Sequence, residues 1–206
     1  SWTLDLDSFE TCEPEAGNAY ERMHLPEGNL SLEFKDVSFH YENSREIYSG
    51  LSFQTNKARS VGILGSNGSG KTTIAALCFE YLKPMAGTIQ LKINDVQNLK
   101  IGYLDQFPEH LIQLKTPSEF ISMMMENGLF SSSLEHTFKK RLSRFGIRWD
   151  RIEEQRGAEL PWATLRTLLI VLLTHCRFDL LILDEPTFGL GWNQKVNLRS
   201  FLRECM

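Results

Sequence analysis

The chain has 206 residues, which is enough for one large domain or for one domain with a small lobe. Hydrophobic residues make up 42% of it and charged residues 23%, as in ordinary globular proteins, and the net charge of −4 gives no general attraction to nucleic acid or anionic lipid. The longest apolar run, LLIVLL (168–173), is far shorter than the ~20 residues that a membrane span needs.

The first half of the chain predicts a tail followed by strands. Residues 1–29 hold seven acidic residues and few basic ones without a sustained period, which predicts a lightly structured tail or linker. LSLEFKDVSF (30–39) alternates apolar and polar residues, as a half-buried strand does. Residues 44–56 predict two more short strands around Gly50, and the compact apolar run SVGIL (60–64) predicts a buried strand.

The second half predicts mostly helices with two further buried strands. The polar breaks SSS and RWD divide its long helical pattern. The predicted elements, in chain order, are a helix over 70–82, strands over 87–93 and 101–104, helical segments over 116–176, a strand over 180–183 and a helix over 192–204. Early strands with helices between the later ones predict a nucleotide core with an inserted helical lobe.

The sequence GSNGSGKTT (65–73) follows a predicted strand and begins a predicted helix, which is the context of a phosphate-binding loop. Its glycines allow a turn whose backbone N–H groups face phosphates, and the start of the helix adds positive potential. We predict that the Lys71 ammonium contacts the β- and γ-phosphates and that the Thr72 hydroxyl ligates Mg²⁺. The predicted nucleotide-binding residues here are Gly65, Ser66, Asn67, Gly68, Ser69, Gly70, Lys71, Thr72 and Thr73.

The sequence LLILDEP (180–186) predicts a buried strand that ends in two carboxylates. Asp184 is predicted to hold Mg²⁺ through water, and Glu185 to orient or deprotonate an attacking water. The alternative is that the two carboxylates only cap a helix start next to Pro186. Because a phosphate loop precedes this strand in the chain, we predict ATP and Mg²⁺ as ligands.

With these motifs in this order, residues 30–206 resemble the nucleotide-binding domain of ABC (ATP-binding cassette) proteins. The resemblance implies an α/β fold, with a P-loop NTPase core, an N-terminal antiparallel β subdomain and an α-helical subdomain inserted at about 107–165. It also implies that Tyr41, 24 residues before Gly65, stacks on adenine, and that Gln106 contacts Mg²⁺ and water and signals to a membrane partner. Taken alone, Tyr41 is a strand aromatic and Gln106 a surface amide.

The segment QFPEH (106–110) is similar to ATPases of energy-coupling-factor importers, which take up vitamins or cobalt and nickel ions in prokaryotes. The resemblance therefore implies an ATPase that powers a transporter from the cytoplasmic face of the cell membrane. Its partners would be a transmembrane subunit and a second ABC ATPase domain, and not nucleic acid. The alternatives are a soluble ABC ATPase without a transport role and a regulatory ATP-binding module with little turnover.

One motif of the family is altered in this chain. The signature LSGGQ of ABC domains begins 24 residues before the aspartate of the Walker-B strand, and Leu160 lies 24 residues before Asp184. The signature serine and glycine N–H groups donate to the γ-phosphate bound by the facing domain, which needs close approach of the backbone. In place of serine, two glycines and glutamine, this chain has Pro161, Trp162, Ala163 and Thr164.

A second alteration lies in FGLG (188–191), where Gly191 replaces the aspartate of the family's D-loop. Both altered segments would face the partner's site, whereas the residues for the chain's own nucleotide are kept. We therefore predict an asymmetric pair, in which a partner with an intact signature completes this chain's site and ELPWATLR (159–166) leaves the reciprocal site poor at hydrolysis. The alternative is that ELPWATLR only begins a helix and that Trp162 packs in the core.

The family's switch histidine would lie beyond Met206, so we predict either that the chain is C-terminally incomplete or that its hydrolysis is further impaired. The acidic residues 1–29 would suit a linker between tandem cassettes. His110 is predicted to lie in a loop and His175 at a helix end. The four cysteines lack metal-ligand spacing and are predicted to be small buried residues in a reducing cytosol; they are Cys12, Cys78, Cys176 and Cys205.

Overall fold

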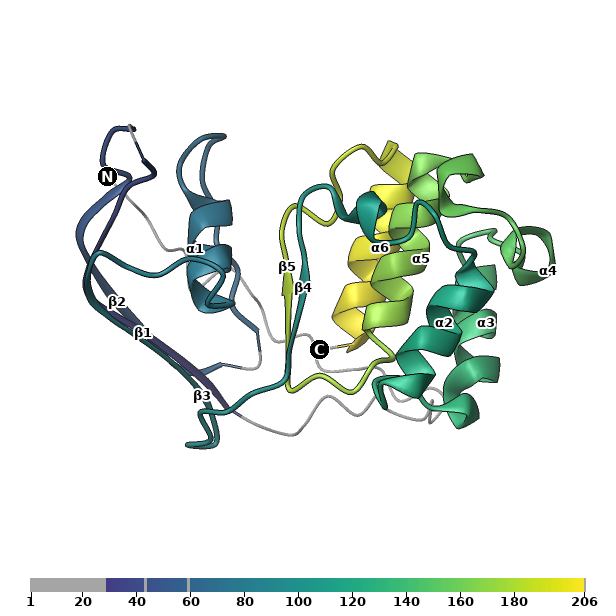
Figure 1. Ribbon diagram of the computed structural model, residues 1–206, viewed down its shortest axis with the longest axis horizontal. Coiled ribbons are helices and arrows are strands. Elements are labelled where there is room, and N and C mark those ends of the chain that lie inside the picture. Colours follow the sequence, from purple (N-terminus) through teal and green to yellow (C-terminus); the bar gives the residue numbers. More distant parts are fainter. Residues whose placement is uncertain (1–28, 43, 59, 206) are drawn as a thin grey trace. The chain divides into compact units, whose positions relative to one another are not determined.

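The computed structural model describes residues 29–205 except residues 43 and 59. These residues form two compact units, 29–99 and 100–205, and each unit is considered by itself (Figure 1). The predicted tail therefore lies outside the described residues, apart from Asn29. No helix in the described ranges is long and apolar enough to cross a membrane.

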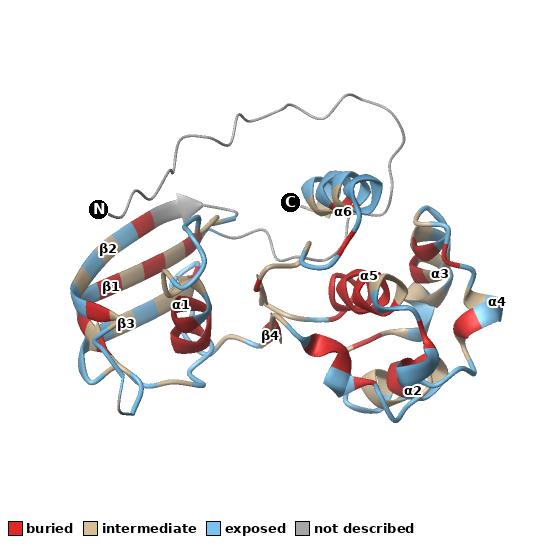
Figure 2. Cartoon of the chain, turned by 90° about the horizontal axis from the view of Figure 1, so that it is seen from above, coloured by how far each residue is buried: buried red, intermediate tan, exposed pale blue. Residues whose placement is uncertain are grey.

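The first unit is a three-stranded antiparallel sheet with one helix (Figure 1). The strand order is β2-β1-β3, and the Phe34 ring stacks on the Phe53 ring of the neighbouring strand at 4.6 Å. Alternate residues of β1 are buried (Figure 2), which confirms the predicted strand over 30–39. The elements are β1 (Leu30–Phe39), β2 (Tyr48–Ala58), α1 (Lys71–Cys78) and β3 (Ala86–Ile93).

Two predictions for this unit are wrong. The residues predicted as two short strands form one strand, β2, which continues through Gly50 because glycine accepts a φ of 64° there. Residues 60–64, predicted as a buried strand, have no regular secondary structure. A parallel strand of this kind needs parallel neighbours, and the sheet of its own unit is antiparallel.

The second unit combines a parallel pair of strands with helices (Figure 1). Strand β4 pairs with β5 in a register that places Ile101 opposite Leu180 and Leu104 opposite Leu183. The elements are β4 (Ile101–Leu104), η1 (Pro108–Leu111), α2 (Pro117–Glu126), η2 (Ser132–Leu134), α3 (Glu135–Ser143), α4 (Trp149–Ile152), η3 (Gly157–Glu159), α5 (Trp162–Leu173), β5 (Leu180–Leu183) and α6 (Trp192–Cys205), where η marks a 3₁₀ helix.

Helix α5 is the centre of this unit. Nine consecutive residues, 165–173, are buried, and Figure 2 shows the helix as almost continuously buried. A helix that is apolar on all sides must be covered on all sides, and α5 lies between the β4–β5 pair and α3 (Figure 1). The order of the helices confirms the predicted helical segments and a break at the serine run, but the predicted break at RWD (148–150) is wrong, because Trp149 and Asp150 begin α4.

Local sequence explains how the helical part begins. Thr116 accepts a hydrogen bond from the Glu119 N–H at 3.2 Å, and the Glu119 carboxylate accepts one from the Thr116 N–H at 2.8 Å. This reciprocal capping, with Pro117 at the first helical position, sets the start of α2. The prediction of small buried cysteines holds for Cys78 and Cys176, whose burial raises the pKa of each thiol to about 12.

Candidate nucleotide-binding and hydrolysis site

The predicted phosphate loop, in the first unit, is a tight turn that ends at the start of α1. Gly68 and Gly70 have φ values of 77° and 92°, in a region that favours glycine. The Ser69 N–H donates to the Ser66 carbonyl at 3.2 Å and closes the turn. Gly70 is the N-cap residue of α1 and has no side chain to cover the helix start, which suits an anion bound there.

Two side chains of this loop fit a phosphate group. Lys71 Nζ donates to the carbonyl oxygens of Gly65 and Ser66, each at 3.0 Å, so the ammonium lies across the loop. The Ser69 hydroxyl is buried and has no hydrogen-bond partner in the described chain. A phosphate oxygen would satisfy the hydroxyl and attract the ammonium, because both groups are donors.

Two tyrosines support the loop from the strands. The buried Tyr48 hydroxyl donates to the Gly70 carbonyl at 2.6 Å, and burial raises the pKa of Tyr48, so the phenol stays a donor. The Tyr41 hydroxyl lies 3.2 Å from the Thr73 hydroxyl, and its ring remains 42% exposed. Tyr41 was predicted from the sequence and Tyr48 was not, because the only signal at Tyr48 is its place at the start of a strand.

The second unit holds the acidic half of the predicted site. Gln106 follows β4, and Asp184 and Glu185 follow β5, so the parallel pairing brings all three to the same edge of the strands. Gln106 Nε2 donates to Glu185 Oε2 at 3.2 Å across 79 residues of sequence. Asp184 is buried, and its N–H donates to the Leu104 carbonyl at 2.9 Å.

A buried arginine that the sequence analysis did not predict lies beneath this pair. Arg166 on α5 is fully buried, and its Nε and Nη2 donate to Glu109 Oε1 at 3.2 and 3.1 Å. Its Nη1 donates to the Glu185 carbonyl at 3.1 Å, and its Nη2 also donates to the Gln106 carbonyl. The available signal was a single charge within the apolar helix WATLRTLLIVLL.

The altered segment ELPWATLR begins helix α5. Pro161 is the N-cap residue of α5 and makes no side-chain hydrogen bond to cap the helix. Its place at the helix start agrees with the alternative that this segment begins a helix. The Trp162 ring packs edge-on against Phe107 and Phe188 and lies 4.8 Å from the guanidinium carbon of Arg166. It remains 36% exposed, so the alternative of a core tryptophan is wrong: the indole packs on its own chain at the surface.

The other singled-out positions have local roles. Gly191 precedes α6, and its N–H donates to the Gln194 side chain at 3.0 Å. His110 lies in the short helix η1 rather than in a loop, with Nδ1 2.6 Å from the Phe107 carbonyl. His175 follows Thr174, the C-cap residue of α5, and so lies at a helix end, as predicted.

Comparison with known proteins identifies a family. The model of the ABC transporter family matches residues 48–188, more than half of the chain. An ABC transporter ATP-binding protein of Photobacterium profundum is 30% identical over 98% of this chain, and one of Onion yellows phytoplasma is 28% identical over 84% of it. The chain spans only 37% and 31% of those two relatives.

Solved structures show the same fold. An ABC transporter ATP-binding protein from Pyrococcus furiosus has a TM-score of 0.66 at 21% identity, with 85% of this chain and 86% of that one covered. A bacterial Atm1-family ABC exporter with ATP bound has a TM-score of 0.67 at 23% identity, with 91% of this chain and 34% of that one covered. At these identities the likeness establishes the α/β P-loop NTPase fold.

Proposed function

The chain belongs to the ABC transporter family, and from this membership we propose that it is the ATP-binding and ATP-hydrolysing domain of a membrane transporter. ATP-binding domains of this family are ATPases and work with transmembrane subunits. The observation that carries the proposal of hydrolysis is the 3.2 Å hydrogen bond from Gln106 to Glu185, because it aims an amide and a carboxylate from two neighbouring strands at one place.

In this proposal the first unit binds the phosphates. Residues 65–70 offer backbone N–H groups, and the Lys71 ammonium exchanges its two carbonyl acceptors for phosphate oxygens. Tyr48 keeps Gly70 in place during this exchange, because its hydroxyl holds the Gly70 carbonyl. Tyr41, next to Thr73, supplies an exposed ring for adenine.

The second unit supplies the acid–base chemistry. Glu185 accepts a proton from the attacking water, and Gln106 fixes the direction of the carboxylate by donating to Oε2. Thr72 in the first unit, and Gln106 and Asp184 in the second, each stay a sequence-based prediction as Mg²⁺ ligands, since hydroxyl, amide and carboxylate oxygens are the ligands that this ion prefers. The ion would neutralise charge on the phosphates when it is bound.

The asymmetric pair remains part of the proposal. Pro161 has no hydroxyl to donate, and Trp162 is held by Phe107, Phe188 and Arg166, so the indole leaves its place only if these contacts break. A segment of this kind supports weak hydrolysis at the nucleotide of a facing domain.

The finer transport assignment rests on sequence alone. We keep the energy-coupling-factor type of importer as a prediction from QFPEH, in which Glu109 and His110 both have structural partners. The regulatory module with little turnover is the second candidate, and the altered signature is the observation that favours it. The two candidates differ in the rate of a single turnover.

The test measures Mg-ATP binding and turnover of the purified chain, alone and mixed with a second ABC domain that has an intact signature. We expect Glu185→Gln to keep nucleotide binding and to lower turnover of the mixture at least about 100-fold, since one positioned base contributes about that much. Glu204→Gln, an exposed carboxylate on α6, is the matched control. Equal turnover in Glu185→Gln and Glu204→Gln would refute the assignment of Glu185.

The altered signature is tested in the same assay. Pro161→Ser should raise the turnover of the chain alone, because the reciprocal site regains a donor hydroxyl while Trp162 keeps its contacts with Phe107, Phe188 and Arg166. The asymmetric pair is wrong if the unmodified chain already hydrolyses ATP alone as fast as the mixture does.

A further inference from the structure

We infer that Arg166 is a positioning residue that holds Gln106 and Glu185 in register for hydrolysis; this inference rests on the proposed function. Arg166 comes from α5, whereas the two residues that it holds follow different strands. Its guanidinium donates to the backbone carbonyls of both, at 3.1 Å for Glu185. One rigid group therefore joins the loop after β4 to the loop after β5.

The backbone of Glu185 needs such an anchor. Its φ of 45° lies in the left-handed region, which is disfavoured for residues other than glycine and persists only where surrounding contacts hold it. Two donors meet at its carbonyl: Arg166 Nη1 at 3.1 Å and the Phe188 N–H at 2.8 Å. With its peptide plane held, the carboxylate of Glu185 keeps one direction.

The anchor also sets the partner of that carboxylate. Arg166 Nη2 donates to the Gln106 carbonyl, and the Gln106 side chain donates to Glu185 Oε2 at 3.2 Å. The guanidinium thus joins the Gln106 carbonyl to the Glu185 carbonyl, and the hydrogen bond between the Gln106 and Glu185 side chains joins the same two residues a second time. A change in the distance between the two loops therefore breaks at least one of these hydrogen bonds.

The guanidinium is itself fixed on all sides. Glu109 accepts from Nε and Nη2 through one oxygen, and the rings of Trp162 and Phe188 lie 4.8 and 5.9 Å from the guanidinium carbon. A planar group with five donors can serve three acceptors at once, which a lysine ammonium on a flexible stem cannot reproduce. Trp162, the residue that replaces a signature glycine, therefore covers the anchor.

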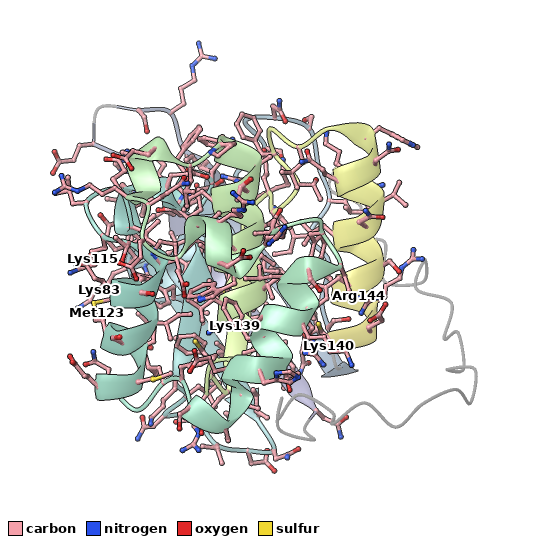
Figure 3. All side chains as sticks on the ribbon, turned by 90° about the vertical axis from the view of Figure 1, so that its right-hand side faces the viewer. Lys83, Lys115, Met123, Lys139, Lys140 and Arg144 are labelled. Carbon is pink, nitrogen blue, oxygen red and sulfur yellow. The ribbon has the colours of Figure 1, made fainter. Side chains whose placement is uncertain are left out.

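If Arg166 served only to pair with the buried charge of Glu109, its hydrogen bonds to the Gln106 and Glu185 carbonyls would not affect hydrolysis. The test therefore separates the ion pair from the positioning role. The variant Arg166→Met with Glu109→Gln removes both buried charges together and leaves none unpaired. It is compared with Glu109→Gln alone, in which the arginine keeps both carbonyl acceptors. The matched control is Arg144→Met, which removes a surface arginine that pairs with Glu204 of α6. Figure 3 shows Arg144 next to this helix.

The experiment measures the melting temperature, the affinity for Mg-ATP and the single-turnover rate of the full chain mixed with the second ABC domain. We expect the double variant to melt close to Glu109→Gln and to bind Mg-ATP equally well, but to hydrolyse it at least about tenfold more slowly, since small misplacements of reacting groups cost up to about 100-fold. Amide hydrogen exchange in residues 105–109 and 184–189 should accelerate in the double variant and not in Arg144→Met.

The outcomes separate this inference from the proposed function. If Glu185→Gln is inactive and the double variant hydrolyses ATP as fast as Glu109→Gln, the positioning role of Arg166 is wrong and the proposed function stands. If the unmodified chain and its partner show no turnover, the proposed function fails and the catalytic role of Arg166 fails with it. Unchanged exchange in both segments would overturn the anchor itself, whatever the turnover.

Discussion

The buried histidine at the end of α5 makes the stability of the second unit dependent on pH. His175 is 4% exposed, and its Nδ1 lies 2.7 Å from the Val171 carbonyl, an arrangement that places the proton of the neutral ring on Nδ1. Its Nε2 then accepts from Arg141 Nη1 at 3.2 Å. A second proton would have to be placed on Nε2, opposite the guanidinium of Arg141, in a ring that also packs at a steep angle against Phe138.

The magnitude follows from the pKa. Burial, with a smaller contribution from the charge of Arg141, lowers the pKa of His175 from 6.5 to about 4. Because the unfolded chain binds the proton more tightly, this stability is fully present above pH 6.5 and is lost as the pH falls toward 4. The total is about 3 kcal/mol, of which about 2 kcal/mol is already lost at pH 5.

The assay is urea denaturation at pH 7.5 and pH 5, followed by circular dichroism. This window avoids the two carboxylates with a lowered pKa, Asp150 and Glu204, whose contribution to stability is present above their ordinary range of about 4 and is lost only as the pH falls below it. His175→Gln keeps an acceptor for Arg141 and removes the imidazole that takes up the proton. The free energy of unfolding of this variant should therefore differ between the two pH values by less than about 0.5 kcal/mol. His110→Gln, at an exposed histidine on η1, should keep the full dependence on pH.

Equal losses of stability between pH 7.5 and pH 5 in the unmodified chain and in His175→Gln would refute the reasoning. The buried ring would then be either charged in the folded state or able to reach water. An NMR titration of the His175 ring gives the same answer directly, since its chemical shifts should stay constant down to about pH 5.

Two further predictions concern close contacts in the separate units. Tyr48→Phe should lower the free energy of unfolding by about 0.5–1.5 kcal/mol and weaken Mg-ATP binding, because the Gly70 carbonyl loses the tyrosine as a donor and keeps the Ile74 N–H at 3.0 Å. Tyr81→Phe, at a tyrosine that is 78% exposed, is the control, and equal urea midpoints in the two variants would contradict this prediction. Gly189→Ala should cost about 1–3 kcal/mol, because the φ of 72° disfavours alanine and the new methyl group would lie 2.6 Å from Trp162 Nε1. An alanine variant with an unchanged urea midpoint would show that the indole moves freely.

Local sequence predicted the elements whose cause is local. The alternation of β1 and the apolar runs of β4 and β5 depend on residues only a few positions apart, so a pattern in the chain was enough to predict these strands. Residues 60–64 carry the same apolar signal as β5 but form no strand. Strand formation depends on a hydrogen-bonded neighbour, which local sequence does not supply.

The same division holds for the candidate site. The phosphate loop and the DEP segment are each one unbroken run of sequence. Residue types and spacing within each run were therefore sufficient to predict roles for Lys71 and Glu185. The role of Arg166 was not visible, because its acceptors at 106, 109 and 185 lie 19 to 60 residues away. Only packing brings them together.

The sequence by itself determined that the chain belongs to a nucleotide-binding family, that its phosphate loop is complete and that its signature is altered. The tertiary structure decided what the altered segment does within its own chain: Trp162 is not a core residue, and it covers an arginine that joins two loops. The reason is physical. Backbone turns and helix starts are set by neighbouring residues, whereas the direction of a buried guanidinium is set by acceptors that only the fold brings within 3 Å or so of it.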